Sequence, residues 1–351
     1  MKKRVVLSLC LLLLISIVCI FASCSKEGEE VLVFTSNGDG TCYVSGINDY
    51  TVLSVSIPYS APNGDVVTAI APGAFAGCSE LASVAIPYSV TSIGDRAFEN
   101  CERLKNIIIP HGVKEIGDRT FYGCYYLESV AIPDTVTSIG EEAFYGCQNI
   151  HNIKIPYGVV SIERAAFSNS RIYDLVIPGS VTSIGFEAFQ YCDTLRSVTI
   201  PASVTVIGDG AFADCNMLNS IELEEGLKVI GNSMFSHCAD IEAVTIPDSV
   251  TVIGESAFNT CEKLSSVTIG DGVSTIGESA FAHCIGLTTV TMSKSVTTIG
   301  DFAFMGAYNL SLVNYTGNEA DWLNIDFGYL NDILNNVEKV TVNYNYVPEG
   351  E

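Results

Sequence analysis

The sequence has few positive charges and few of the residues that build metal or catalytic sites. Its 351 residues include 17 Lys and Arg against 40 Asp and Glu, and only four His. The formal charge of −23 repels a phosphate backbone, so we expect no nucleic-acid partner. Because it lacks a C-x-x-C pair, a Ser-centred elbow and a glycine-rich phosphate loop, the sequence predicts no metal ligand, no cofactor and no catalytic residue.

The start of the chain has the composition of an export signal. Three basic residues at 2–4 precede the apolar run Val5–Phe21, and a small pair then leads to Cys24. This order resembles a bacterial lipoprotein signal, which implies removal of residues 1–23 and a lipid on Cys24. The polar residues 24–30 then predict a tether. An uncleaved membrane helix is the alternative, because the apolar run approaches the length that spans a bilayer.

A single phenylalanine register runs through the middle of the chain. Its members lie 23 residues apart, with one interval of 22, and they are Phe75, Phe98, Phe121, Phe144, Phe167, Phe189, Phe212, Phe235, Phe258, Phe281 and Phe304. A constant period of this length predicts a solenoid, in which each unit buries its apolar side only against its neighbours. We expect the phenylalanines to stack along the interior, with a local kink at the short interval.

Each unit also carries the pattern L-x-x-L-x-L, as at Leu104, Ile107 and Ile109. The alternating apolar residues predict one short strand of a parallel sheet, with the intervening residues facing outward. The pattern therefore predicts an α/β repeat solenoid of about 12 repeats of 23 residues. We expect its parallel β-sheet on the concave side, and short strands, turns and short helical turns on the convex side. The twelve units begin at Val52, Leu81, Leu104, Leu127, Ile150, Ile172, Leu195, Leu218, Ile241, Leu264, Leu287 and Leu310.

The two ends of the array depart from this pattern. Residues 31–51 hold two candidate strands around a turn sequence rich in Asn, Asp and Gly, which predicts a hairpin that caps the first unit. The solenoid is expected to cover residues 52–315. Residues 316–351, which include the single tryptophan Trp322, predict a C-terminal cap.

Two further columns accompany the phenylalanines. A glycine and an acidic residue precede Ala-Phe in most units, as in Gly94-Asp95, and we interpret the carboxylate as part of the first turn of a short helix. A cysteine follows three places after nine of the phenylalanines, as Cys101 follows Phe98. Inward side chains of adjacent units run parallel rather than toward one another, which favours reduced, buried thiols acting as small apolar fillers over disulfides.

Taken together, I-P-x-x-V-x-x-I-G-x-x-A-F-x-x-C-x-x-L-x-x-V resembles the BspA-like class of bacterial leucine-rich repeats. The resemblance covers about Val52 to Tyr315. It implies a secreted or surface-attached protein without catalytic residues, with a role in adhesion to host proteins or in contact between cells. It does not imply a particular ligand.

The outward positions of the predicted strands are mostly Ser, Thr, Ala and Asn, but larger or charged residues occupy them in the middle units. Solenoids bind partners over extended surfaces, and Tyr and Arg are the strongest anchors at interfaces. The alternative is that these side chains are merely solvated. The ligand-face candidates are Glu128, His151, Lys154, Tyr173, Asp174, Arg196, Glu222 and Glu242.

The sequence thus predicts an exported, lipid-anchored protein of the bacterial cell surface that binds an extracellular protein or glycan, such as one on a host surface, without catalysis. Its contact with the membrane is expected through the lipid alone. Two alternatives stay open. One is an enzyme or enzyme accessory that acts on an extracellular polymer, and the other is a passive structural spacer in the envelope.

The lipid anchor gives the first prediction. A clickable fatty acid supplied to expressing cells should label the wild-type chain and should not label Cys24→Ala, because only the Cys24 thiol can accept the lipid at that site. Labelling is measured by in-gel fluorescence. Equal labelling of the two proteins would contradict the anchor.

Overall fold

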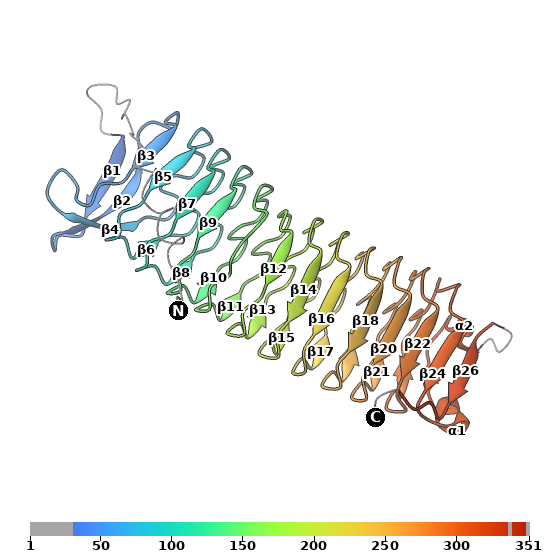
Figure 1. Ribbon diagram of the computed structural model, residues 1–351. Coiled ribbons are helices and arrows are strands. Elements are labelled where there is room, and N and C mark those ends of the chain that lie inside the picture. Colours follow the sequence, from blue (N-terminus) through green and yellow to red (C-terminus); the bar gives the residue numbers. More distant parts are fainter. Residues whose placement is uncertain (1–30, 336–338, 349–351) are drawn as a thin grey trace, which may run out of the picture. The chain divides into compact units, whose positions relative to one another are not determined.

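The computed structural model describes residues 31–335 and 339–348. The proposed signal peptide 1–23, the tether 24–30 and Cys24 lie outside the described residues. From Leu32 onward the chain forms one compact unit, in which short coils stack on one another (Figure 1). This is the solenoid that the 23-residue period predicts.

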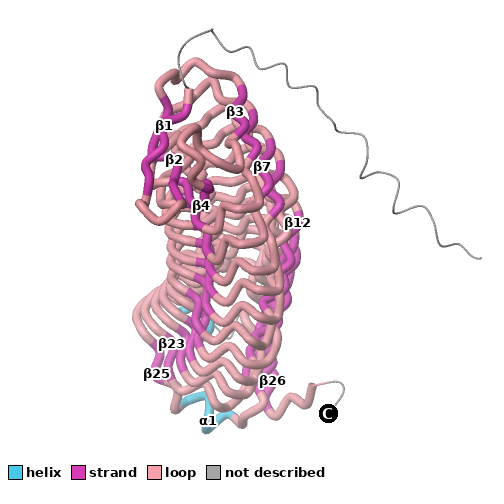
Figure 2. The backbone as a smooth tube through the Cα atoms, turned by 90° about the vertical axis from the view of Figure 1, so that its left-hand side faces the viewer, coloured by secondary structure: helices cyan, strands magenta, loops and turns pink. Residues whose placement is uncertain are grey.

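The L-x-x-L-x-L segments form a first ladder of parallel strands, which are hydrogen-bonded in three successive sheets of four, three and five strands. Figure 2 shows it as one of two columns of strands. Residues alternate between inward and outward along each strand. In β18, for example, Val244 and Ile246 are buried, while Ala243 and Thr245 are exposed. The strands of this ladder are β3 (Ser54–Ser56), β5 (Ser83–Ala85), β7 (Asn106–Ile108), β9 (Ser129–Ala131), β12 (Asp174–Val176), β14 (Ser197–Ile200), β16 (Ser220–Leu223), β18 (Ala243–Ile246), β20 (Ser266–Ile269), β22 (Thr289–Met292), β24 (Leu312–Tyr315) and β26 (Thr341–Tyr344).

The returning side of each coil contributes a second ladder, whose strands are mostly two residues long. Most of these short strands end in one buried isoleucine, as Ile139 and Ile162 show, whereas Ile207 and Phe327 are partly exposed. Every pair in it is parallel except β1 with β2. Its strands are β1 (Leu32–Ser36), β2 (Thr41–Ile47), β4 (Val66–Ile70), β6 (Ser92–Ile93), β8 (Glu115–Ile116), β10 (Ser138–Ile139), β11 (Ser161–Ile162), β13 (Ser183–Ile184), β15 (Val206–Ile207), β17 (Val229–Ile230), β19 (Val252–Ile253), β21 (Thr275–Ile276), β23 (Thr298–Ile299) and β25 (Asp326–Phe327).

The two ends of the array are built differently. At the start, β1 and β2 form an antiparallel hairpin, and β2 continues in parallel to β4. At the other end, β25 and β26 extend the second and first ladders by one strand each. The helix α1 (Glu319–Leu323) precedes β25 in the chain, and the helix α2 (Asp332–Asn335) lies between β25 and β26.

The third side of each coil, around Ala-Phe, consists of successive turns. In it every second N–H is donated to the next unit, as from Phe98 to the Thr120 carbonyl at 3.0 Å, while the others close local turns. Two left-handed residues, four positions apart, occur on this side of the coil, for example Arg96 and Asn100 with φ of 58° and 56°. A left-handed residue cannot continue an α-helix, so the turns of this side do not join into one.

The acidic residue before Ala-Phe therefore does not begin a helix, and our interpretation of it was wrong in that respect. Its carboxylate instead accepts a backbone N–H of the following unit. Asp95 Oδ1 accepts from Asp118 at 3.0 Å, and Asp118 Oδ1 accepts from Glu141 at 2.8 Å. Asp209 and Asp301 do the same. These carboxylates link one unit to the next.

The first ladder is interrupted in the unit that begins at Ile150. Only an isolated bridge, between Asn152 and Asp174, stands where a strand was expected. The interruption adjoins the 22-residue interval, where the chain from Phe167 to the next strand is one residue shorter. Because register along a strand depends on the length of the preceding turn, a missing residue disturbs pairing at that point.

The phenylalanine column is the centre of the core, as predicted. All eleven rings are at most 1% exposed, and neighbouring rings stack at centroid distances of 5.1–5.7 Å with interplanar angles of 0–16°. Offset parallel stacking of this kind adds to the gain from burying the rings. Each inner phenylalanine is thus packed by its two neighbouring units.

The cysteine column is buried, and the ten cysteines from Cys42 to Cys284 are free thiols. Eight of them donate Sγ–H to the carbonyl of the phenylalanine 26 or 25 residues earlier, as Cys101 does to Phe75 at 3.1 Å. Ser170 replaces one cysteine and makes the same bond, to Phe144 at 2.9 Å. Most members of the column therefore combine a small side chain with a donor, which our interpretation as apolar fillers left out, whereas Ala307 fills the same position without one.

The core yields a stability prediction. Phe212→Ala should lower the free energy of unfolding by about 3–5 kcal/mol, because it leaves a cavity between two stacked rings. Denaturant titration measures the loss. The matched control is Thr245→Ala at an exposed position of β18, which should change stability by less than about 0.5 kcal/mol. Similar losses for the two variants would contradict the stacked core.

The thiols yield a pH prediction. Burial raises the pKa of Cys78 to about 11 and the pKa of Cys192 and Cys284 to about 12. A raised pKa keeps a thiol neutral below that pH, and only the thiolate reacts, so these cysteines should resist iodoacetamide at pH 8 in the native protein. Mass spectrometry of alkylated peptides checks this. An added thiol at exposed Ser36 should react within minutes, and all ten should react after denaturation. Rapid native labelling of Cys192 would contradict the burial.

Candidate ligand-binding face

The candidate residues lie on the outward side of the first ladder, which we call the strand face. Backbone bonds hold one outward position of successive units in line, since Glu128 N–H bonds to Lys105 O at 2.7 Å and Tyr173 N–H to His151 O at 2.9 Å. Arg196 N–H continues the line to Tyr173 O at 3.2 Å. Side chains at this position therefore follow one another along the face.

Three of these side chains form a stack. The His151 and Tyr173 rings are parallel within 3°, with centroids 4.6 Å apart, and the Arg196 guanidinium carbon lies 5.6 Å from the Tyr173 centroid. The imidazole is further held by Nδ1, 3.1 Å from the Arg171 carbonyl oxygen. Exposed cation–π contacts contribute about 0.5–1 kcal/mol, enough to bias the orientation of these side chains before a ligand arrives.

Charged candidates surround the stack. Glu222 Oε2 accepts a hydrogen bond from Thr199 Oγ1 at 3.2 Å, and Asp174 begins β12 beside the stacked Tyr173. In the part of the chain that the structure describes, Glu128, Lys154 and Glu242 have no side-chain hydrogen bond or ion pair. Their charges are thus available to a partner.

Sequence reasoning missed two apolar residues on the same face. Ile108 is 73% exposed and Val176 is 77% exposed, and both occupy the outward position that Lys154 and Glu222 occupy in their units. The sequence could have identified Ile108 and Val176 as outward-facing, because each of them directly follows an inward-facing residue of its strand. An aliphatic side chain at an outward position is a departure from the pattern, as a charge is.

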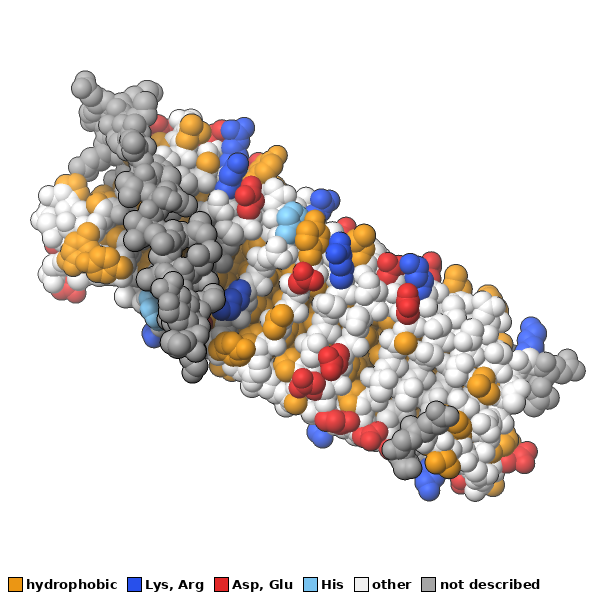
Figure 3. Space-filling model, viewed as in Figure 1, with side chains coloured by type: hydrophobic (Ala, Val, Ile, Leu, Met, Phe, Trp, Pro, Cys, Tyr) orange, Lys and Arg blue, Asp and Glu red, His pale blue; other side chains and the backbone are white. Residues whose placement is uncertain are grey.

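The remaining part of the strand face is different in character. Thr245, Thr268 and Thr291 follow one another at the outward position of β18, β20 and β22. In Figure 3 charged, histidine and hydrophobic side chains gather over the middle units, whereas the surface over β18–β22 is mostly uncoloured. The face is therefore uneven along its length, with its chemical variety in the middle.

The described residues offer little basis for metal chemistry. Between residues 31 and 335 and from 339 to 348, no three His, Cys, Asp or Glu side chains gather as a metal site would need. In the same ranges neither helix is long enough to cross a membrane.

The fold and this face together define a leucine-rich repeat solenoid. The family described as "BspA type Leucine rich repeat region" matches the chain in six copies, over residues 68–196 and 182–311. The chain belongs to this family.

Solved structures of bacterial proteins resemble the chain over most of its length. A leucine-rich repeat protein from Bacteroides ovatus is 25% identical, with 91% of this chain and all of that chain covered and a TM-score of 0.48. A leucine rich cell surface protein from Faecalibacterium prausnitzii is 25% identical, with 85% and 97% covered and a TM-score of 0.44. The pneumococcal vaccine antigen PcpA is 16% identical, with 91% and 98% covered and a TM-score of 0.54, a likeness of fold. Comparison with curated protein sequences gives no significant match.

Proposed function

We propose that this chain is an exported surface protein that binds an extracellular protein through the middle of its strand face, without catalysis. Export is supported by the signal-like N-terminus, and surface attachment by the lipoprotein-like Cys24. Membership of the BspA type family agrees with a repeat surface used for binding. The anchor at Cys24 would keep the protein on the cell from which it is exported.

The observation that carries the proposal is the stack of His151, Tyr173 and Arg196. The fold does not need it, because other units place Ser, Thr or Asn at the same position. Tyr and Arg are the residues on which binding energy concentrates at protein interfaces, and a partly ordered stack loses less entropy when it binds.

A protein partner is favoured over a glycan on this face. The strand face also carries the exposed aliphatic side chains Ile108 and Val176, and charges of both signs. An apolar and aromatic centre with a charged rim is the usual anatomy of a protein interface. We expect a partner with a small apolar patch and charges that complement Glu128, Lys154 and Glu242.

The test is binding of the purified chain to arrays of extracellular matrix proteins and glycans. Tyr173→Ala and Arg196→Ala should each weaken binding to the protein ligand at least tenfold, about 1.4 kcal/mol or more. Biolayer interferometry gives the dissociation constants. Thr268→Ala, on the same face in β20, is the matched control and should bind as the wild type does.

The outcomes separate the possible functions. Absence of binding to any array member would favour the passive spacer, and turnover of a polymer on the array would favour the enzyme. Capture of a glycan that depends on Tyr173 would change the class of ligand. An equal loss in Thr268→Ala would mean that the stack is not the anchor.

A further inference from the structure

A groove lies away from the strand face, where the second ladder passes into the turns of the third side. It has a volume of about 520 Å³ and spans four successive units. Its lining residues are Pro72, Gly73, Asp95, Arg96, Asp118, Arg119 and Glu141. Binding sites for small molecules commonly have volumes of about 300–1,000 Å³, so this groove has room for one or two sugar rings.

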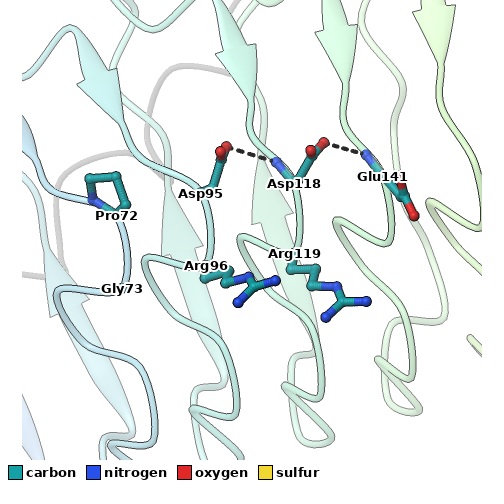
Figure 4. A pocket seen from close by; sticks show the side chains of 7 residues that line it. All are labelled: Pro72, Gly73, Asp95, Arg96, Asp118, Arg119 and Glu141. Atoms are coloured by element: carbon teal, nitrogen blue, oxygen red, sulfur yellow. Dashed lines mark hydrogen bonds between the residues drawn. The ribbon is translucent and has the colours of Figure 1, made fainter.

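Two arginines of adjacent units project into the groove side by side, as Figure 4 shows. Arg96 is exposed and has no ion pair or side-chain hydrogen bond within the described residues. Arg119 is held by an ion pair from Nε to Glu142 Oε2 at 2.8 Å, and its guanidinium carbon lies 5.5 Å from the Tyr122 ring centroid. One arginine is therefore oriented in advance and the other is unpaired.

The fold does not call for arginine at this position. The backbone there is left-handed, with φ of 58° at Arg96 and 54° at Arg119, and it is left-handed at the equivalent residue of the other units as well. Those residues are Gly73, Glu142, Ala165, Glu187, Gly210, Ser233, Ser256, Ser279 and Phe302. Arginine is disfavoured in this conformation relative to glycine. The fold accepts several residue types at this position, so packing does not require arginine in these two adjacent units.

The three carboxylates of the groove are already partly engaged. One oxygen each of Asp95 and Asp118 accepts the backbone N–H of the next unit, and Glu141 Oε1 accepts from Arg164 at 2.6 Å. Figure 4 shows the first two turned along the row of units, away from the arginines. Each carboxylate retains a second oxygen that can accept a hydrogen bond.

The groove therefore offers two guanidinium donors next to several carboxylate acceptors. A dianion such as phosphate would be repelled by the carboxylates, whereas a neutral ligand would leave the unpaired guanidinium of Arg96 unused. A ligand with one carboxylate and several hydroxyl groups satisfies both sets, because arginine binds carboxylates through two parallel N–H bonds. Acidic sugars have this combination.

We propose that this groove binds the carboxylate of an acidic saccharide. Arg96 and Arg119 hold the anion, and the free oxygens of Asp95, Asp118 and Glu141 accept hydrogen bonds from sugar hydroxyls. Local charge supports this choice of site. Of the 13 Lys and Arg after residue 30, nine lie between Arg96 and Arg196, so an anion meets less repulsion here than along the acidic C-terminal half. The site shares no residue with the stack on the strand face, so either site can fail without the other.

The test is isothermal titration calorimetry of the purified full chain with two matched pairs of ligands. Galacturonate is compared with its methyl ester, and sialyllactose with its methyl ester, so that the two members of each pair differ only in the charge of the carboxyl group. At least one acidic ligand should bind tenfold or more tightly than its neutral counterpart, and the pair that responds tells uronic acids from sialic acids. Raising NaCl from 50 to 300 mM should weaken that binding, because part of it is electrostatic.

Arg96→Gly is the informative variant, because glycine suits a φ of 58° and should leave the fold intact. It should weaken binding of the acidic sugar at least tenfold. Arg103→Ala removes an equal charge outside the groove, from an exposed pair with Glu80, and should leave binding unchanged.

Four results would overturn the proposal. They are failure of both acidic ligands to bind, equal affinity for the neutral ligands, binding of inorganic phosphate as tight as that of the sugars, and an equal loss of affinity in Arg103→Ala. Circular dichroism of the two variants confirms that each is folded when it is titrated.

Discussion

The structure depends on the burial of each coil against the next. A phenylalanine ring has another ring on each side, and the turn that carries it donates every second N–H to the following unit. One unit alone would expose its ring and leave those N–H groups unpaired, and an unpaired polar group is costly where water is excluded. Stability is therefore a property of neighbouring pairs, and the side chains that face outward contribute little to it.

This division explains how much of the fold the sequence predicts. The 23-residue period, the inward positions of the first ladder and the phenylalanine column all repeat at fixed intervals, so periodicity alone reveals them. The second ladder was harder, because a strand such as Ser138–Ile139 is too short to show an alternation. The roles of Cys101 and Asp95 could not be read locally, since their partners lie in a different unit, 26 and 23 residues away.

The two candidate sites were predictable to different degrees. Tyr173 and Arg196 were found because outward strand positions can be counted from inward ones. The groove was not found, because Arg96 was hidden in a segment interpreted as a helical turn, where its side chain would point elsewhere. The backbone is left-handed at Arg96, and its side chain therefore lines the groove instead of following a helical turn. Because the units carry different residues at this position, the backbone does not require arginine there.

The same reasoning applies to any repeat array, because the units serve as references for one another. Where nearly every unit agrees, as in the phenylalanine column, the residue is needed for packing. Where units differ at an equivalent position without loss of the fold, the difference is free to reflect binding. Ser and Thr at the outward positions of β20 and β22 set the background, against which Tyr173 with Arg196 stands out on one face. Small or acidic residues occupy the position of Arg96 and Arg119 in most other units. Both departures fall in the half of the array that also carries most of the positive charge and the one shortened unit, so the chemistry for recognition is concentrated there while the acidic half repeats its pattern more closely.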